Sequence, residues 1–481
     1  MKKIKIMSAI VLLQFVINQP YSIAQNEIDA LRYSQNFPTG SARFTAMGGA
    51  FGALGGDFST LSQNPAGIAI YRKSEITFTP SVFNNSAEAV HYGNSAFGNK
   101  SNFNFGNAGI VITFPTGDNS GWVSSNIGFG YNHMNNFNSR VSIDGVNNES
   151  SLLDVWKQQI EQNNFDQFGS ELAWNAYLID TTANGKYFTA YPNYKERQTK
   201  NMNRTGGLGE TVFSFGGNYE NKLYLGGSIG FTRIRFTENS TYTETTNLKD
   251  TANKLQYFTF NENLTTSGSG INLKLGLIYR ATDFFRIGGA IHTPTYYDLN
   301  DKWDSQLDAK FTDTSFSFKS EKGRADYALA TPFKAIGSCA FIFGKSGLIS
   351  LDYEFLDYSL ARLSGSGTNN YSFSEENKQI GNKYISAGNI KVGTEWKINP
   401  FAIRAGFAHY GNPFASGIGN RGIYNSVSAG FGIREENFFI DFGYVLSKMS
   451  EKYYLYNPAL IQPTDFDFLA QSFLVTFGVR F

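Results

Sequence analysis

The chain has little of several residues on which whole classes of protein depend. Its 481 residues include one cysteine, four histidines and 12 prolines, and the formal net charge is +1. The single cysteine, Cys339, cannot form an internal disulfide, and we interpret it as a small apolar strand residue. The neutral balance argues against a nucleic-acid partner, which requires a basic surface. Beyond the N-terminus, no apolar run reaches the roughly 20 residues that a transmembrane helix needs.

The sequence also lacks the motifs of common enzymes and metal sites. The four histidines, at positions 91, 133, 292 and 409, do not have the spacing of metal ligands. No phosphate-binding P-loop occurs, and the one GxSxG pattern, at 226–230, lies inside the predicted strand 222–236 instead of at a strand-to-helix turn. A catalytic triad assembled from separate strands would show no such motif. We expect no metal, no cofactor and no enzymatic activity.

The first 24 residues have the three parts of an export signal. Three lysines within residues 2–5 precede an apolar run from 6 to 17. Small residues at Ser22 and Ala24 then predict cleavage after Ala24. An uncleaved anchor is the alternative. The mature protein is therefore expected to leave the cytoplasm.

The residues that are abundant favour a membrane barrel. The chain contains 49 glycines, 44 phenylalanines and 27 tyrosines, which suits lipid-facing strands with aromatic girdles. Residues 470–481 alternate strictly, with one apolar face formed by Phe473, Val475, Phe477, Val479 and Phe481. A last strand that ends in phenylalanine resembles the signal read by the barrel assembly machinery of the outer membrane, so Phe481 is the expected contact.

The same alternation recurs along the chain and predicts fourteen strands of about the length that a tilted strand needs to cross the bilayer. They are 74–84, 107–116, 122–134, 209–219, 222–236, 270–280, 284–293, 332–343, 347–357, 388–398, 401–410, 424–434, 437–447 and 470–481. Short turns, such as 117–121 and 399–400, alternate with long connections. The long ones are 85–106, 135–208, 237–269, 294–331, 358–387, 411–423 and 448–469.

Short periplasmic turns opposite long extracellular loops are typical of an outer-membrane barrel. The sequence thus predicts an all-β fold, a 14-stranded antiparallel transmembrane β-barrel over residues 74–481 in a Gram-negative-type outer membrane. Most strand charges fall on the inward phase, as an outward charge is costly at the bilayer midplane. Arg233 and Arg235 break this rule near the extracellular end of their strand. They either meet lipid phosphates or mark a kink.

Residues 25–73 precede the first strand and do not alternate. Glycine recurs through this segment, and small residues permit close backbone packing and positive φ. Apolar residues such as Phe44, Phe51 and Phe58 need burial, which a flexible periplasmic tail would not provide. We therefore predict an N-terminal plug inside the lumen.

The stretch AMGGAFGALGGD at 46–57, followed by NPAG at 64–67, resembles the FadL-type outer-membrane transporters of long-chain fatty acids and other hydrophobic compounds. Fourteen strands and the terminal phenylalanine agree with this resemblance. It implies that the N-terminal segment is a hatch inside the barrel, that the motif Asn64, Pro65, Ala66 and Gly67 lies in that hatch, and that substrates leave sideways through the wall. The residue matches are confined to about 41–80.

The long connection 135–208 contains two amphipathic helical patterns. Their apolar positions are Leu152, Val155, Trp156, Ile160, Phe168, Leu172, Trp174 and Tyr177. These faces either form a groove that captures an apolar ligand or pack on each other and close the barrel top.

A fatty-acid carboxylate would require a cation in the lumen. Lys274, Arg404 and Arg434 fall on the inward phase and are candidates. Alternatively, these charges pair with lumenal carboxylates or with the plug.

Together these features predict an uptake channel for hydrophobic small molecules, with long-chain fatty acids as the expected substrate and passive diffusion as the mechanism. The expected partners are the ligand, outer-membrane lipid and the assembly machinery, and we expect a monomer. The alternative from another class is an accessory barrel or scaffold of a protein secretion system. A general polar porin conflicts with the plug.

Overall fold

A computed structural model describes residues 26–481 except 117–120, 192, 247–253, 368 and 421. The predicted export signal, its cleavage site and most of the predicted turn at 117–121 lie outside the described residues.

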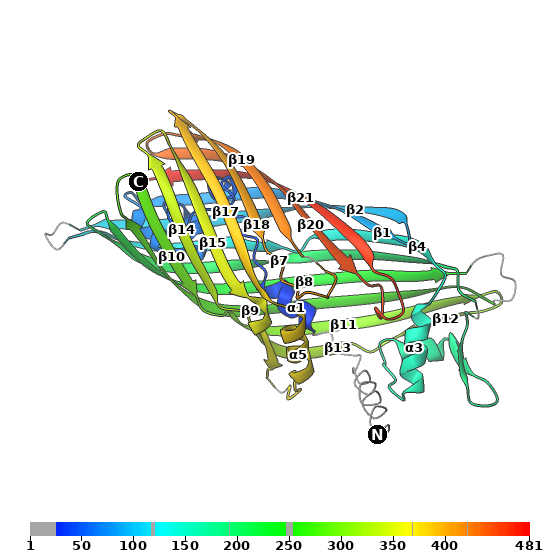
Figure 1. Cartoon of the computed structure of the whole chain (residues 1–481). Helices are drawn as coiled ribbons and strands as arrows, with labels where there is room; N and C mark the ends of the chain where they lie inside the picture. Colours follow the sequence, from blue (N-terminus) through cyan, green and yellow to red (C-terminus); the bar gives the residue numbers. More distant parts are fainter. Residues whose placement is uncertain (1–25, 117–120, 192, 247–253, 368, 421) are drawn as a thin grey trace, which may run out of the picture.

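Fourteen strands form one closed antiparallel ring (Figure 1). In ring order they are β1 (Glu75–His91), β2 (Asn94–Pro115), β3 (Trp122–Asn136), β7 (Glu196–Tyr219), β8 (Leu223–Thr245), β9 (Leu255–Arg280), β10 (Phe285–His292), β14 (Lys334–Phe343), β15 (Gly347–Asp357), β17 (Ser386–Ile398), β18 (Phe401–Tyr410), β19 (Tyr424–Arg434), β20 (Phe438–Tyr453) and β21 (Thr464–Arg480). The ring closes because β21 pairs with β1 from Arg480–Glu75 to Asp465–Val90. The predicted 14-stranded barrel is confirmed.

Several strands are much longer than predicted, and four of the predicted long loops are wrong in part. The region 85–106 is a continuation of the β1–β2 hairpin, 237–269 belongs mostly to β8 and β9, and parts of 135–208 and 448–469 extend β7, β20 and β21. Apart from the stretch of β2 that holds Phe103 and Phe105, these extensions project beyond the apolar part of the wall. Their outward side chains meet water, so the alternation that reveals a lipid-facing strand is missing there.

The predicted loop 294–331 is also mostly β-structure. It contains β11 (Tyr296–Phe311), β12 (Ser315–Lys319) and β13 (Gly323–Ala330). β11 follows β10 in the chain and pairs with the same strand, β9. β13 pairs with β11 and leads directly into β14. Pro294 and Pro332 stand in the two short breaks, where the missing N–H prevents a regular ladder.

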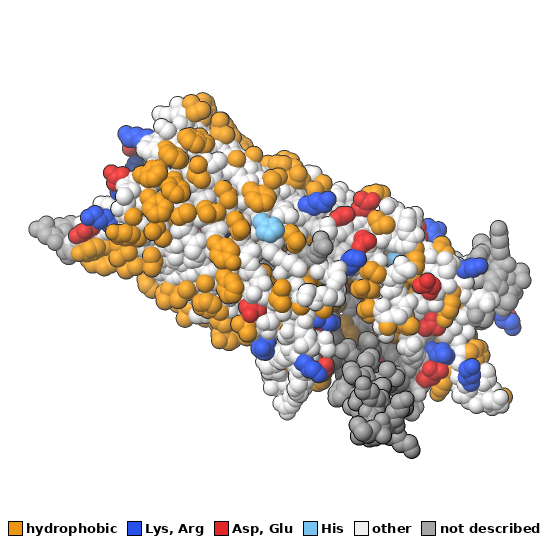
Figure 2. Space-filling view, viewed as in Figure 1, with side chains coloured by type: hydrophobic (Ala, Val, Ile, Leu, Met, Phe, Trp, Pro, Cys, Tyr) orange, Lys and Arg blue, Asp and Glu red, His pale blue; other side chains and the backbone are white. Residues whose placement is uncertain are grey.

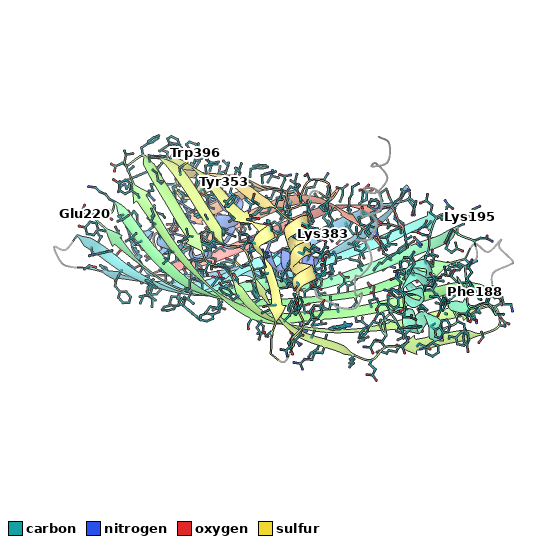
Figure 3. All side chains as sticks on the ribbon, turned by 60° about the horizontal axis from the view of Figure 1, so that its bottom comes forward. Phe188, Lys195, Glu220, Tyr353, Lys383 and Trp396 are labelled. Carbon is teal, nitrogen blue, oxygen red and sulfur yellow. The ribbon has the colours of Figure 1, made fainter. Side chains whose placement is uncertain are left out.

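The barrel is tall on one side and short on the other (Figure 1). β7, β8 and β9 contain 24, 23 and 26 residues, whereas β18 and β19 contain 10 and 11. Glu220, in the turn between β7 and β8, lies at one end of the molecule, and Phe188 and Lys195, in the long connection before β7, lie at the other (Figure 3). The long connections therefore gather at the end that we expect to be extracellular.

An apolar belt surrounds the wall. On β9, Leu273, Leu275 and Leu277 are 44–59% exposed, whereas the alternating Asn272 and Lys274 are nearly fully buried. Figure 2 shows apolar side chains gathered over the half of the molecule that holds the short strands, with charges toward the ends. Successive strand residues face opposite sides, so this pattern places lipid outside and polar groups inside. No helix among the described residues is long and apolar enough to cross a membrane.

The connections at the extracellular end form smaller elements. They are β4 (Ser139–Asn147), α3 (Leu152–Glu161), α4 (Ser170–Asn175), β5 (Ile179–Thr181), β6 (Tyr187–Thr189), η3 (Tyr358–Leu360), β16 (Arg362–Gly365) and α5 (Ser374–Lys383). α3 begins at a capping box, in which Asp154 accepts a hydrogen bond from the Ser151 backbone N–H and Ser151 caps the first turn.

The N-terminal segment (residues 26–73) contains α1 (Glu27–Ser34), α2 (Ala42–Ala46), η1 (Phe58–Ser62) and η2 (Pro65–Ile70). Each element begins at a side-chain cap, from Asn26, Ser41, Asp57 and Asn64 respectively. The turns between them use the glycine pairs 48–49 and 55–56, all at φ between +63° and +74°. Short capped turns thus let the segment fold compactly against the inner wall.

Candidate transport path

The N-terminal segment docks where the wall has glycine. At twelve wall glycines a Cβ would come within 3.0 Å of atoms of the segment. These are Gly106, Gly109, Gly128, Gly130, Gly216, Gly226, Gly276, Gly288, Gly393, Gly406, Gly430 and Gly443. They run around the ring from β2 to β20. The absence of side chains at these positions makes room for the segment across the lumen.

The Asn64–Gly67 motif is fixed to β8 and β9. The Asn64 side-chain amide donates to the carbonyl oxygens of Gly52, at 2.6 Å, and Leu277, at 3.1 Å, and its Oδ1 accepts from the Ala66 N–H at 3.1 Å. A Cβ on Gly276 would lie 1.9 Å from Asn64 Oδ1. One on Gly226 would lie 2.3 Å from the Pro65 carbonyl oxygen. Asn64 therefore ties two parts of the segment to each other and to the wall.

A buried chain of charges holds the other side of the segment. Arg43 donates to Glu395 on β17 through Nε, at 2.8 Å, and Nη2, at 3.0 Å. Arg404 contacts the same carboxylate at 2.6 Å and Asp441 at 2.8 Å. Arg434 completes the chain, 2.6 Å from Asp441. Because Glu395, Arg404 and Asp441 are fully buried, removing one partner would leave an uncompensated charge.

The wall itself has a gap between β2 and β3. Their ladder ends at the pair Asn107–Asn132. Beyond it, among the described residues, β2 pairs only with β1 and β3 only with β7. The register of β3 also shifts between His133 and Asn135. This stretch of wall therefore lacks the backbone hydrogen bonds that seal the rest of the ring.

The gap opens at the extracellular edge of the apolar belt. Phe103 and Phe105, on the outward face of β2 beside it, are 61% and 45% exposed. Residues 37–40 of the N-terminal segment run along its inner side. The Phe37 N–H donates to the Met134 carbonyl oxygen at 2.9 Å, and the Thr39 N–H donates to that of His133 at 3.2 Å. The segment thus occupies the edge of β3 that β2 leaves open.

Phe37 links this edge to the opposite wall. Its ring stacks on Tyr424 of β19, with 4.3 Å between centroids, and meets Tyr410 of β18 edge-on at 4.9 Å. Offset and edge-on aromatic pairs contribute about 0.5–1.5 kcal/mol each beyond burial. Phe37 therefore spans the lumen from the gap to the short side of the barrel.

Helix α1 precedes this bridge and contacts α5. Lys383 of α5 lies 2.6 Å from Glu27, and the Tyr384 hydroxyl donates to the Glu27 carbonyl oxygen at 3.1 Å. Burial raises the pKa of the Asp29 carboxyl to about 7, against the opposing effect of its ion pair with Arg32. Displacing α1 would therefore lower the pKa of Asp29 toward its ordinary value and break the contacts between α1 and α5.

Comparison with known proteins identifies the architecture. No protein-family model and no curated protein matches the chain. Among solved structures, a Pseudomonas aeruginosa FadL homologue is 12% identical with a TM-score of 0.56, covering 93% of this chain and 99% of that one. The Pseudomonas putida toluene transporter TodX is 12% identical with a TM-score of 0.55, covering 93% and 100%. The Ralstonia pickettii toluene transporter TbuX is 14% identical with a TM-score of 0.52, covering 92% and 99%.

The chain has the FadL-type fold. Identities of 12–14% show the fold alone, so what these neighbours carry does not by itself define the ligand of this FadL-type barrel. The likeness extends over nearly the whole chain, whereas the sequence resemblance rests on about 41–80.

The predicted groove residues of this FadL-type barrel are mostly buried. Trp156, Ile160 and Leu172 join one apolar cluster with strand residues, Leu152 and Trp174 pack at its edge, and Val155 is buried. Trp156 meets Phe260 of β9, with 5.1 Å between ring centroids. Phe168 contacts Trp303, and Tyr177, 61% exposed, contacts Phe316. This arrangement favours closure of the barrel top, and a capture groove at these residues stays a prediction.

The three cationic residues predicted to bind a ligand carboxylate do not lie together, and each is paired with a carboxylate of the protein itself. Arg404 and Arg434 share Asp441. Lys274 on β9 lies elsewhere and forms a buried ion pair with Glu210 of β7. The geometry corresponds to the alternative in which lumenal charges pair with one another, and a role in binding a ligand carboxylate stays a prediction. Among the described residues, no cluster of histidine, cysteine and carboxylates could hold a metal ion.

Sequence reasoning missed three features of the path. The docking glycines have no motif, because their role depends on the strand register. Phe37 lies in a stretch without periodicity. A cavity of about 890 Å³ at the extracellular end is lined by the 412–420 connection and the upper ends of β20 and β21. It is formed because β19 begins at Tyr424, opposite Met449, and leaves the rest of β20 without that neighbour.

Proposed function

We propose that this protein is an outer-membrane uptake channel for hydrophobic small molecules, working as a monomer by passive diffusion. One observation supports this most: the wall ladder is interrupted at the extracellular edge of the apolar belt, where the N-terminal segment lines the gap, while the same segment occupies the lumen. An open polar pore would need the reverse, a clear lumen and a sealed wall.

In this proposal the N-terminal segment is the hatch. A ligand enters at the extracellular end, on the short side of the barrel, and reaches the region of α1 and Phe37. Displacement of residues 37–40 then uncovers the gap beside Phe103 and Phe105, and the ligand leaves sideways into the membrane. Burying an apolar chain contributes about 0.8 kcal/mol per CH₂, so the surrounding lipid supplies the driving force for departure from a polar lumen.

Long-chain fatty acids are one candidate substrate within this class. Their carboxylate needs a cation, and Lys274, Arg404 and Arg434 each have a carboxylate partner already. Uncharged hydrocarbons need no such partner. Two of the solved neighbours are named as toluene transporters. These observations favour an uncharged ligand over a fatty acid, and competition between palmitate and toluene separates the two.

An accessory barrel of a protein secretion system is the second candidate, because the extended polar strands at the extracellular end offer a large surface. That role requires a protein partner in fixed stoichiometry, whereas transport requires a small apolar ligand.

Native mass spectrometry of the detergent-purified protein, with extraction and identification of bound molecules, tests the proposal. We expect a small apolar molecule whose occupancy falls in an Asn64→Ala variant. A barrel that carries a stoichiometric protein and no apolar molecule would reject transport as the main role. Added palmitate and toluene then distinguish the two substrate classes by competition.

A further inference from the structure

Two arginines stand on the lipid-facing side of the tall wall. Arg233 and Arg235 are both exposed, on the same face of β8 as Phe231, which is 53% exposed. The ladders of β8 with β7 and β9 run through both positions without a register shift. A kink, the alternative for their outward phase, is therefore absent, and both guanidinium groups project from the outer surface.

Their neighbours leave them accessible and without a carboxylate. Arg233 is paired across the ladders with Gly209 and Ser269, and Arg235 with Gly207 and Ser267. Glycine on one side and serine on the other add no charge and little bulk. Among the described residues, no ion pair involves either arginine. By contrast, the exposed Arg197 on β7 contacts Asp144 at 2.6 Å.

Their height on the wall identifies the environment. One row below, Phe231 and its ladder partner Ile271 are exposed members of the apolar belt. One row above the belt, an outward arginine costs about 0–1 kcal/mol, against about 2–4 kcal/mol at the midplane. The arginines therefore lie at the membrane interface on the side of the long connections, where the headgroups of the outer leaflet are.

We propose that Arg233 and Arg235 form a binding site for the phosphate groups of an outer-leaflet glycolipid. The planar guanidinium donates in pairs to phosphate oxygens, and Ser267 and Ser269 offer hydroxyl donors beside it. Positions two apart on a strand are about 6.6 Å from each other, so the arginines hold one phosphate between them or two adjacent phosphates.

The site also has a position relative to the gap. β8 is the second neighbour of β3, about 10 Å away at the strand spacing of a sheet. The rows of Arg233 and Arg235 correspond to β3 near His133, where the β2–β3 ladder has ended. A glycolipid anchored here extends its acyl chains down the belt beside the opening. The site does not depend on transport, and its test is independent of the transport test.

The experiment compares the wild-type barrel with an Arg233→Gln, Arg235→Gln double variant in nanodiscs that contain bisphosphorylated lipid A. Native mass spectrometry counts the lipid A molecules retained per barrel after release from the disc. Arg197→Gln is the matched control, since it removes an exposed arginine from neighbouring β7 about 33 Å further along the strand direction, away from the membrane. The heat-dependent shift of the folded barrel on SDS gels verifies folding of each variant.

We expect the double variant to retain about tenfold less lipid A, equivalent to about 1.4 kcal/mol, and the control to match the wild type. Lipid A without phosphates should be retained poorly by all three proteins. Equal retention by the wild type and the double variant would overturn the site, as would retention that ignores the phosphates. Inorganic phosphate that displaces lipid A at millimolar concentration would reassign the site to free phosphate.

Discussion

The dock between Gly276 and Asn64 allows a direct test of the hatch. Replacing Gly276 with valine adds a Cβ that would lie 1.9 Å from Asn64 Oδ1 and 3.0 Å from Pro65 Cδ, both too close for the present arrangement. β9 is held in the ring on both sides, so the hatch must move rather than the strand. We expect Gly276→Val to leave the barrel assembled and to undock the motif from the wall.

The magnitude follows from the hydrogen bond to the wall that undocking breaks and from the steric clash. Of the three hydrogen bonds that Asn64 makes, to Gly52, Leu277 and Ala66, only the one to Leu277 joins the hatch to the wall, and it contributes about 0.5–1.5 kcal/mol. Overpacking a fitted site costs about 1–3 kcal/mol. If only part of this is relieved by rearrangement, docking weakens by about 3 kcal/mol, on the order of a hundredfold in the docked-to-undocked ratio.

Single-channel recording in planar bilayers measures this directly. The wild type should show small conductance, and Gly276→Val should show frequent large openings as the hatch leaves the lumen. Gly337→Val on β14 is the matched control, because a Cβ there meets nothing within 4 Å and faces outward. A folded Gly276→Val barrel that conducts like the wild type and the control would refute the idea that the wall glycines hold the hatch.

Three further predictions concern the bridge, the charge chain and α1. Phe37→Ala removes two aromatic contacts worth about 1–3 kcal/mol together, so hydrogen exchange at the Thr39 amide should accelerate; unchanged exchange would show that the bridge does not hold the segment. Arg404→Ala should destabilise the barrel by about 3–5 kcal/mol by uncovering two buried carboxylates, seen as a lower unfolding temperature on SDS gels, whereas Arg324→Ala, which breaks an exposed pair, should cost less than about 1 kcal/mol. Since the docked-state pKa of Asp29 is raised to about 7 from an ordinary 3.8, docking of α1 should be strongest below about pH 4 and weaken as the pH rises through 7. Exchange of α1 amides, corrected for intrinsic rates, reports this, and Asp29→Asn should abolish the pH dependence.

The sequence predicts the barrel because lipid imposes a simple rule on the outward face. On β9 the alternation from Leu273 to Tyr279 needs no tertiary information, and the same holds for β21 up to Phe481. The extension of β8 beyond Arg235 follows no such rule, since residues such as Thr241 and Thr243 are polar and meet water outside. Strand pairing there is set by the neighbours, which local sequence does not encode.

The candidate transport path likewise combines features that the sequence predicts with features that it does not. The Asn64–Gly67 motif and the glycine-rich turns are visible in the sequence, because they act through local caps and positive φ. The pairing of Lys274 with Glu210 joins residues 64 positions apart on strands that are not adjacent in the ring. The bridge from Phe37 to Tyr424 crosses the lumen. Both depend on ring closure and could not be inferred from spacing.

Uptake of radiolabelled solutes into cells that differ only in this protein tests the central claim most directly. Toluene, palmitate and a sugar of similar size to toluene are compared in the same strain with and without the protein. We predict faster uptake of at least one apolar solute and no change for the sugar. Apolar uptake that is independent of the protein, or sugar uptake that rises with it, would contradict the proposal of a hatch-controlled channel for hydrophobic molecules.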